Sequence, residues 1–270
     1  MFDELEAVAR RAAFGAGEII RQHIGHIAAS WIHSKGPSDY VTEVDERCER
    51  LILEQVATNF PDHHIMSEET ASDGLQPGYT WVIDPLDGTT NFIHGFPFVA
   101  VSIAVCKDKK PVVGVVFDPI RNELFSAREG EGAWLNGTRL KINTGVKLEE
   151  ALLATGFPFR AKKYMDSYLK TFREIFLRVG SIRRAGAAAL DLAYLGAGRV
   201  DGFWEIGLKA WDIAAGSLIV REAGGMVSDF WGEDNHLDNG NVVGGTPTVF
   251  PFVLDQVQKW LVPALEKREE

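Results

Sequence analysis

The sequence predicts a layered α/β protein of two halves, and three observations lead to that fold class. Apolar side chains recur at helical spacing near the start of the chain, a run of alternating strands follows them, and the residues beyond about 145 mix short strands with helices. No long linker separates these regions. We therefore expect halves 1–145 and 146–270 that share an interface within one compact unit.

The first half begins with two predicted helices. Residues 2–24 carry one apolar stripe, and a second helix with an apolar face ends before Pro61. The residues expected on these buried faces are Leu5, Val8, Ala12, Ala16, Ile19 and Ile20, then Val44, Cys48, Leu51, Ile52 and Val56. Between the helices, residues 34–38 have the composition of a loop.

An antiparallel sheet is predicted next. Trp81–Ile83 is a short apolar strand, and residues 99–105 alternate as a half-buried strand should. Residues 111–117 and 123–127 form an expected hairpin joined by 118–122, and the turn at Gly130–Gly132 continues the meander.

The second half alternates strands and helices. The predicted strands are 152–156, 181–184 and 200–206, and the predicted helices are 164–179, 187–197 and 213–223. Gly198 and the pair Gly224-Gly225 end the last two helices.

Composition limits the classes of function. The chain has 270 residues, 46% hydrophobic and 24% charged, with a formal net charge of -10, which argues against a general nucleic-acid binder. The longest stretch without charged residues, Gly88–Cys106, is interrupted by polar residues and proline, so we expect no membrane span and a soluble cytoplasmic protein. Cys48 and Cys106 are expected to be reduced core residues.

Carboxylates precede or begin predicted helices at four places: Asp45, the pair Glu68-Glu69, Asp84 with Asp87, and Asp212. Mg²⁺ prefers oxygen ligands of this kind. Asp84 and Asp87 stand three residues apart across Pro85, so both side chains and the Leu86 carbonyl can face one pocket. Gly88-Thr89-Thr90 then offers backbone N–H groups to an anion, and the Thr89 hydroxyl can hold a water.

Each of these residues also has an ordinary structural explanation. Asp84 and Asp87 are common turn formers, Thr42 with Asp45 matches a capping box, and Asp212 would be an N-cap for helix 213–223. Glu68 and Glu69 could be solvated. If the carboxylates converge, their repulsion raises their pKa values and a cation relieves it; spacing alone leaves both explanations open.

Four motifs together resemble the inositol monophosphatase family. Asp84–Phe92 resembles its first signature and Trp211–Gly216 its second, while Ser67–Glu69 and Asp39–Asp45 resemble two further motifs in the same order. The similarity runs over nearly the whole chain, and Arg183–Gly225 is especially similar to bacterial members. The order and spacing of all four motifs make the resemblance specific.

The resemblance implies the αβαβα sandwich of the inositol monophosphatase and fructose-1,6-bisphosphatase type, usually a homodimer, with the site between the halves. It implies Mg²⁺-dependent, lithium-sensitive hydrolysis of myo-inositol monophosphate by in-line attack of a metal-activated water, with two to three ions per site. By matching positions, the metal ligands are Glu68, Asp84, Leu86, Asp87 and Asp212. Glu68, Thr89 and Asp45 are the implied catalytic residues, and the implied substrate contacts are Asp87, Gly88, Thr89, Ala188, Glu205 and Asp212. Lys35 matches a mobile loop near the metals.

Departures from the family pattern concern the substrate. Ser67 stands where the family usually carries Gly, Ala187 where many members carry Thr or Ser, and Lys209 where some members carry His. Related sugar phosphates such as fructose 1,6-bisphosphate therefore stay open as alternative substrates. Bacterial members also have a role in transcription and RNA processing. A locally basic region fits such a role or, more simply, a solvated or dimer-interface surface; it comprises Arg160, Lys162, Lys163, Arg173, Arg178, Arg183 and Arg184.

Overall fold

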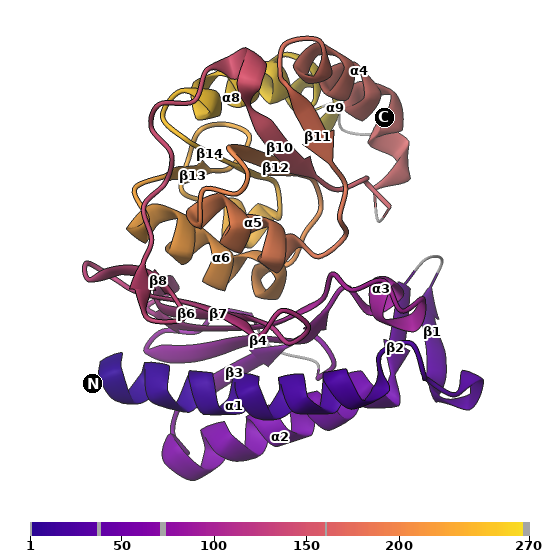
Figure 1. The fold of residues 1–270 in the computed structure, drawn as a ribbon, viewed down its shortest axis with the longest axis vertical. Coiled ribbons are helices and arrows are strands. Elements are labelled where there is room, and N and C mark those ends of the chain that lie inside the picture. Colours follow the sequence, from indigo (N-terminus) through magenta and orange to yellow (C-terminus); the bar gives the residue numbers. More distant parts are fainter. Residues whose placement is uncertain (1, 37–38, 71–73, 160, 267–270) are drawn as a thin grey trace.

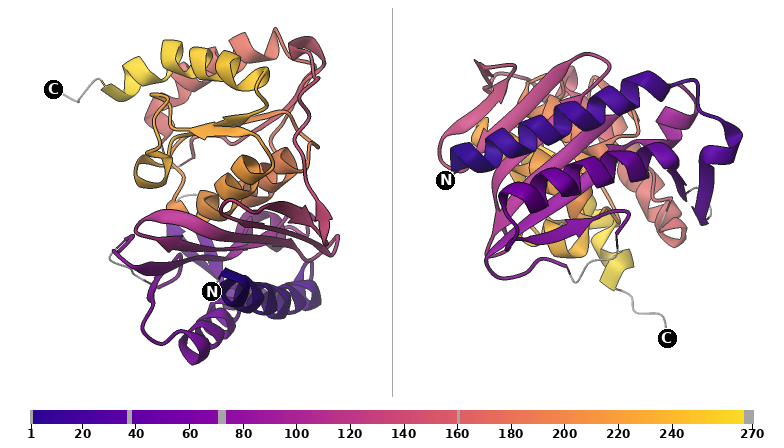
Figure 2. Two further views of the ribbon diagram at one scale, coloured as in Figure 1. Left: turned by 90° about the vertical axis from the view of Figure 1, so that its left-hand side faces the viewer. Right: turned by 90° about the horizontal axis from the view of Figure 1, so that it is seen from below.

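The computed structural model describes residues 2–36, 39–70, 74–159 and 161–266, and they form five layers (Figure 1). The outer helices α1 (Phe2–His23) and α2 (Glu43–Asn59) cover one face of a seven-stranded sheet. Helices α5 (Ala188–Gly196) and α6 (Ala210–Glu222) fill the middle layer. A five-stranded sheet and the helices α4 (Met165–Phe176) and α8 (Val249–Trp260) complete the stack, which Figure 2 shows edge-on. The predicted αβαβα fold is confirmed.

The seven-stranded sheet has the strand order β3-β4-β5-β6-β7-β8-β9. All neighbouring pairs are antiparallel except β3 and β4, which are parallel. The strands are β3 (His64–Ser67), β4 (Tyr79–Asp87), β5 (Ala100–Lys107), β6 (Lys110–Asp118), β7 (Glu123–Arg128), β8 (Gly132–Leu135) and β9 (Thr138–Arg139). The hairpin predicted from 111–117 and 123–127 is therefore confirmed.

The prediction of a half-buried strand at 99–105 was wrong, because β5 is buried on both faces. Val101, Ile103 and Val105 pack under α1 and α2, as the alternation predicted. The other face carries small residues, Ala100 and Ala104 among them, on which the middle helices pack. Small side chains let α6 approach closely: a Cβ at Gly114 of β6 would lie 2.8 Å from the Ala215 carbonyl oxygen. Sequence alternation revealed only the face with large side chains.

Residues 34–36 were predicted as a loop and lie instead in a strand. β1 (Ile32–Gly36) pairs antiparallel with β2 (Asp39–Thr42), and this pairing satisfies backbone groups that the composition alone did not assign. Residues 37 and 38 of the predicted loop lie outside the described residues. The hairpin leads directly into α2.

The five-stranded sheet has the order β11-β10-β12-β14-β13 and mixes parallel and antiparallel pairs. Its strands are β10 (Leu152–Thr155), β11 (Ser181–Arg183), β12 (Gly202–Glu205), β13 (Met226–Ser228) and β14 (Val242–Gly245). The remaining helices of the described chain are short: α3 (Thr89–Ile93), α7 (His236–Asn239), α9 (Val262–Glu266) and three 3₁₀ turns at Ala29–Trp31, Leu148–Glu150 and Lys162–Tyr164.

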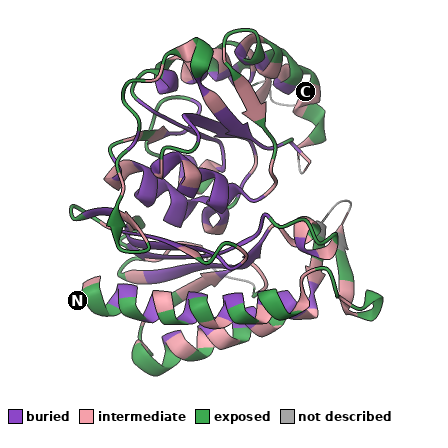
Figure 3. Ribbon diagram, viewed as in Figure 1, coloured by how far each residue is buried: buried purple, intermediate pink, exposed green. Residues whose placement is uncertain are grey.

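Burial follows the layers. The middle helices α5 and α6 are buried nearly all round, whereas α1 and α2 alternate buried and exposed residues along their length (Figure 3). Cys48 and Cys106 are both buried and free, as expected of core residues. Among the described residues, no helix is long and apolar enough to span a membrane. The middle layer lies between the two sheets, so residues from both halves meet around it.

Candidate active site

The carboxyl end of β4 places two aspartates beside each other. β4 extends four residues beyond the predicted Trp81–Ile83, and its pairing with β5 is irregular between Asp84 and Asp87. The Leu86 N–H donates to Asp84 Oδ1 at 3.0 Å, which is a local turn bond. Both carboxylates are nonetheless buried, at 1% and 8% exposure. The turn explanation therefore applies to Asp84, and the metal-binding role of Asp84 and Asp87 stays a prediction.

The short helix α3 begins directly after these aspartates. Gly88 precedes it in the left-handed region, at φ 91°, and Thr89 is its first residue. The Thr89 hydroxyl lies 3.0 Å from Asp45 Oδ1 and 3.2 Å from the Leu86 carbonyl oxygen. Because a hydroxyl has one hydrogen, it donates to one of these acceptors at a time.

Asp45 serves two partners at once. Its Oδ2 accepts the Thr42 backbone N–H at 2.9 Å and also bonds the Thr42 hydroxyl, so the predicted capping box is confirmed. Its Oδ1 is the atom that faces Thr89. The helix cap thus fixes the carboxylate that holds the Thr89 side chain.

The second half contributes Asp212 from the first turn of α6. This helix begins at Ala210, so the prediction of Asp212 as the residue before the helix was wrong. Asp212 is the third residue of α6, and its Oδ2 accepts the N–H of Lys209, the residue before the helix, at 2.7 Å. The carboxylate therefore pairs a backbone N–H at the helix start, as in a capping box. Across the halves, Asp87 Oδ2 accepts the Ala189 N–H at 2.7 Å.

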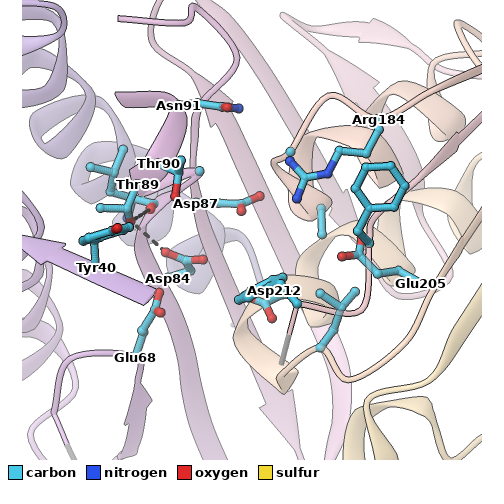
Figure 4. A pocket seen from close by; sticks show the side chains of 17 residues that line it. Tyr40, Glu68, Asp84, Asp87, Thr89, Thr90, Asn91, Arg184, Glu205 and Asp212 are labelled. Atoms are coloured by element: carbon cyan, nitrogen blue, oxygen red, sulfur yellow. Dashed lines mark hydrogen bonds between the residues drawn. The ribbon is translucent and has the colours of Figure 1, made fainter. Parts of the chain in front are cut away.

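A cavity of about 320 Å³ lies between the halves where these residues meet. In Figure 4, Glu68, Asp84 and Thr89 lie on one side, Arg184 and Glu205 lie on the other, and Asp87 and Asp212 extend between them. We call six of the lining residues from the first half the first wall: Glu68, Asp84, Leu86, Asp87, Gly88 and Thr89. The second wall comes from the second half and includes Phe157, Arg184, Ala188, Glu205, Leu208 and Asp212.

The cavity brings together nearly every residue that the sequence predicted for the site. Asp45 stands behind Thr89 and does not line the cavity among the described residues. Lys35 lies in β1, and its side chain is outside the described part of the structure, so its predicted place in a mobile loop stays a prediction.

Three buried carboxylates in or behind the first wall have pKa values above the ordinary one. Burial and the charges of Glu68, Asp87 and Asp212 raise the pKa of Asp84 well above its ordinary value of 3.8. Burial is the largest cause that raises the pKa of Asp87, and the charge of Asp212 is the second. The hydrogen bond from the Ala189 N–H lowers the same pKa. Burial raises the pKa of Asp45 to about 7, with a contribution from Glu69. These carboxylates are close enough to repel one another.

The donor set fits a divalent cation. Within the described ranges, no group of three or more His, Cys, Asp or Glu side chains is arranged so that it could hold a metal ion. Asp87 and Asp212 each direct one oxygen to a backbone N–H. Mg²⁺ usually takes only one or two carboxylates, with water and phosphate completing its shell. All the buried acidic donors here are oxygens, and a cation would relieve their mutual repulsion.

Thr90, predicted to offer a backbone N–H group to an anion, also lines the cavity. Sequence reasoning gave no site role to several other lining residues, namely Tyr40, Asn91, Phe157, Phe159, Arg184, Gly186 and Leu208. Arg184 had been counted only in the basic region, yet its guanidinium lies 5.5 Å from the Phe157 ring centroid at the cavity. Its nearness in sequence to Ala188 was the one available signal. Asp191 is also buried nearby, where burial and the charges of Glu205 and Asp87 raise its pKa.

Comparisons with known proteins agree with this geometry. The model of the inositol monophosphatase family matches residues 1–269. The chain is 48% identical over 261 residues to Nus factor SuhB of Escherichia coli K12, covering 96% of this chain and 98% of that one. It is 49% identical over 266 residues to Nus factor SuhB of Pseudomonas aeruginosa, with the same coverage of 96% and 98%.

Solved structures show the same fold. The extragenic suppressor protein SuhB from Bartonella henselae matches with a TM-score of 0.90 and 39% identity, covering 95% of this chain and 99% of that one. The inositol monophosphatase of Thermotoga maritima matches with a TM-score of 0.86 and 36% identity, covering 96% and 98%. The family match spans nearly the whole chain, and the chain belongs to the inositol monophosphatase family.

Proposed function

We propose that the protein hydrolyses small phosphate monoesters with Mg²⁺, and that myo-inositol monophosphate is its preferred substrate. The observation that supports this most directly is the convergence of Glu68, Asp84, Asp87 and Asp212 on one cavity beside Thr89. Like charges gathered in a buried site need cations, and cations beside a phosphate-sized space suit phosphoryl transfer. A structural neighbour from Thermotoga maritima is itself named an inositol monophosphatase.

Mg²⁺ would be held mainly by the first wall. Glu68, Asp84 and the Leu86 carbonyl would hold one ion, and Asp84, Asp87 and Asp212 a second, with a third, weaker ion near Glu68. When bound, Mg²⁺ would offset the repulsion among the carboxylates and stabilise negative charge on the phosphate and the departing alkoxide.

The chain's own groups would orient the water and the phosphate. When the Thr89 hydroxyl donates to Asp45, its lone pairs are left to accept a hydrogen from water, and Glu68 can take up the proton. The backbone N–H groups of Gly88 and Thr89 would bind phosphate oxygens. The water oxygen then attacks phosphorus in line with the ester oxygen, and that P–O bond breaks with its electron pair going to the ester oxygen. This oxygen takes a proton from a solvent water as the alcohol leaves, and Glu68 returns its proton to solvent.

The second wall would bind the alcohol. Glu205 and Asp212 offer carboxylates to hydroxyl groups, Ala188 leaves space, and Phe157 and Leu208 provide apolar surface. A polyol has hydroxyls on every side, so a wall of mixed polar and apolar groups suits it. Fructose 1,6-bisphosphate remains the alternative substrate of the same machinery.

The test is phosphate release from inositol 1-phosphate, fructose 1,6-bisphosphate, glycerol 2-phosphate and adenosine phosphates, with Mg²⁺ and with chelator. We expect the highest kcat/KM for inositol 1-phosphate and loss of turnover in chelator. Undiminished turnover in chelator would exclude the metal-dependent reaction, and a strong preference for another ester would replace the proposed substrate.

We also propose a second function, a role with the transcription machinery, because the relatives at 48–49% identity are named Nus factors. Those names favour this second function over catalysis. A candidate surface for a protein partner lies at α4, where Leu169 and Phe176 are 50% and 55% exposed, with Leu177, 60% exposed, directly after the helix. Arg173 and Arg178 of the basic region lie beside them, whereas Arg160 is outside the described residues. An exposed apolar patch with basic neighbours suits an acidic protein surface.

An Asp87→Asn variant separates the two functions. We expect it to lose phosphatase activity and still co-purify with transcription proteins in mild salt. If neither the wild type nor the Asp87→Asn variant co-purified with a specific transcription protein, the second function would be contradicted. Loss of binding together with activity would show that the two functions share one site.

A further inference from the structure

We propose that Asn91 is a positioning residue that holds the second wall at a fixed position relative to the first. The proposal rests on the phosphatase function proposed above, because it concerns how the phosphate and the alcohol of one substrate are held relative to each other. Asn91 belongs to α3, directly after the residues assigned to the phosphate.

The Asn91 side-chain amide bonds both halves at once. Its Nδ2 donates to the Phe98 carbonyl oxygen at 2.8 Å and to the Ala185 carbonyl oxygen at 2.9 Å. Both amide hydrogens are therefore used, one in each half. Figure 4 shows Asn91 extending from the α3 side of the cavity toward the segment that carries Arg184. No other side-chain type of this size offers two donors at one atom.

Two glycines allow the contact. A Cβ at Gly88 would lie 3.1 Å from the Phe98 carbonyl oxygen and 3.3 Å from the Gly186 carbonyl oxygen. A Cβ at Gly186 would lie 2.7 Å from Arg184 Nη1 and 3.2 Å from Asn91 Nδ2. Both residues also have positive φ angles, 91° and 94°, which side chains disfavour. A side chain at Gly88 would crowd the backbone of the other segment, and one at Gly186 would crowd the Asn91 amide itself, so both positions favour glycine.

The contact reaches the cavity through a few residues. Ala185, held by Asn91, is followed within four positions by Ala188, which lines the second wall, and Ala189, whose N–H bonds Asp87. Arg184 precedes it and lines the same wall. A shift of the 184–189 segment would move the alcohol relative to a phosphate held by the first wall. Misplacement of about 1 Å can lower a reaction rate about 100-fold.

The test uses two variants at position 91 and one matched control. Asn91→Asp keeps the shape but turns an oxygen toward two carbonyl oxygens, and Asn91→Leu removes both donors without adding charge. Asn136→Asp is the control, since Asn136 Nδ2 donates to the Asn122 carbonyl oxygen at 3.1 Å within the first half, far along the sheet from the cavity. Each protein is assayed with inositol 1-phosphate and with methyl phosphate, whose alcohol is too small to need the second wall.

In both Asn91 variants, kcat/KM for inositol 1-phosphate should fall by about 10- to 100-fold. The fold-loss in kcat/KM for methyl phosphate should be less than about a third as large. The control should affect the two substrates equally. Equal losses on both substrates for the Asn91 variants would overturn the proposal, because they would indicate a general structural role or damage to the metal site.

Hydrogen exchange of the metal-free proteins gives a readout that needs no activity. The amides of residues 185–189 should exchange faster in both Asn91 variants than in the wild type and in Asn136→Asp. Unchanged protection there would overturn the proposal even if activity fell. If the wild type released no phosphate from any ester, the phosphatase function would fail, while the exchange result would still decide whether Asn91 holds this segment.

Discussion

The two walls of the cavity are built in different ways. The first wall comes almost entirely from one continuous segment, Asp84–Thr89, with Glu68 added from directly after the neighbouring parallel strand β3. Its groups are carboxylates, a carbonyl and backbone N–H groups. The second wall collects Phe157, Arg184 and Glu205, with other residues of the second half, from separate loops, helices and the end of strand β12. It mixes a cation, carboxylates and apolar surface.

This difference suggests a division of labour. A compact set of oxygen ligands suits the part of the substrate that never changes, the phosphate with its metal ions. A wall assembled from several segments can change one residue at a time, and it suits the part that differs among family members, the alcohol. Changes in the first wall should then affect all substrates alike, and changes in the second wall should alter preference.

The largest effect is expected at Asp87. In Asp87→Asn the side-chain oxygen can still accept the Ala189 N–H, so the fold should be kept, while the charge of a proposed metal ligand is lost. We expect kcat/KM to fall by about 1,000-fold or more, as for other losses of a charge-stabilising group, and equally for every ester. Steady-state kinetics on the substrate panel, with circular dichroism as the folding control, measures this. A loss confined to one alcohol would break the division between the walls.

The next effect is expected at Thr89. Thr89→Val keeps the shape but removes the hydroxyl that bonds Asp45, so kcat should fall about 100-fold with little change in KM. Thr89→Ser restores the hydroxyl and should recover most of the rate. If the valine variant matched the wild type, or the serine variant stayed as slow as valine, Thr89 would have no part in orienting the water.

A smaller, selective effect is expected at Gly156, which no sequence pattern singled out. A Cβ there would lie 1.8 Å from Glu205 Oε1, so Gly156→Ala must displace the end of that flexible side chain. Because Glu205 belongs to the second wall, kcat/KM should fall about 10-fold for inositol 1-phosphate and hardly at all for methyl phosphate, in line with the loss of one hydrogen bond to a charged group. Glu205→Gln should show the same selectivity. Equal losses on both substrates would contradict the assignment of Glu205 to the alcohol.

The smallest expected effect is on stability without metal. The folded pKa of Asp84 lies above its ordinary value of 3.8, so its contribution to stability is greatest below that value and is lost as pH rises toward the folded pKa. In chelator, the melting temperature of the wild type should therefore fall as the pH rises above about 4. Asp84→Asn should reduce that fall and melt higher at pH 7, by roughly 2–4 °C for each kcal/mol gained. A lower melting temperature for the variant would show that the carboxylates do not repel one another in the folded state.

Much of the fold and of the first wall could be predicted from the sequence, since both are encoded locally. Helical and alternating apolar patterns located α1, α2 and the β6–β7 hairpin, and the carboxylates of Asp84–Asp87 lie within four residues of one another. The second face of β5 could not be predicted, because alanine and cysteine look unremarkable until a helix packs on them.

The second wall was predicted only in part. Ala188, Glu205 and Asp212 were assigned through resemblance to the family, and the cavity contains them. Arg184 and Phe157 reach the same place through tertiary packing, and their surrounding sequence has no pattern that distinguishes them from surface residues. The contact of Asn91 with Ala185 joins residues 94 positions apart, which no local pattern reveals.

We propose that the carboxylates of the first wall hold Mg²⁺. Calorimetric titration of the metal-free protein with Mg²⁺ measures this, with Asp87→Asn titrated beside the wild type. We predict at least two ions per wild-type chain and the loss of at least one in Asp87→Asn. The same number of ions bound with the same affinity by both proteins, or no binding by the wild type, would contradict the claim.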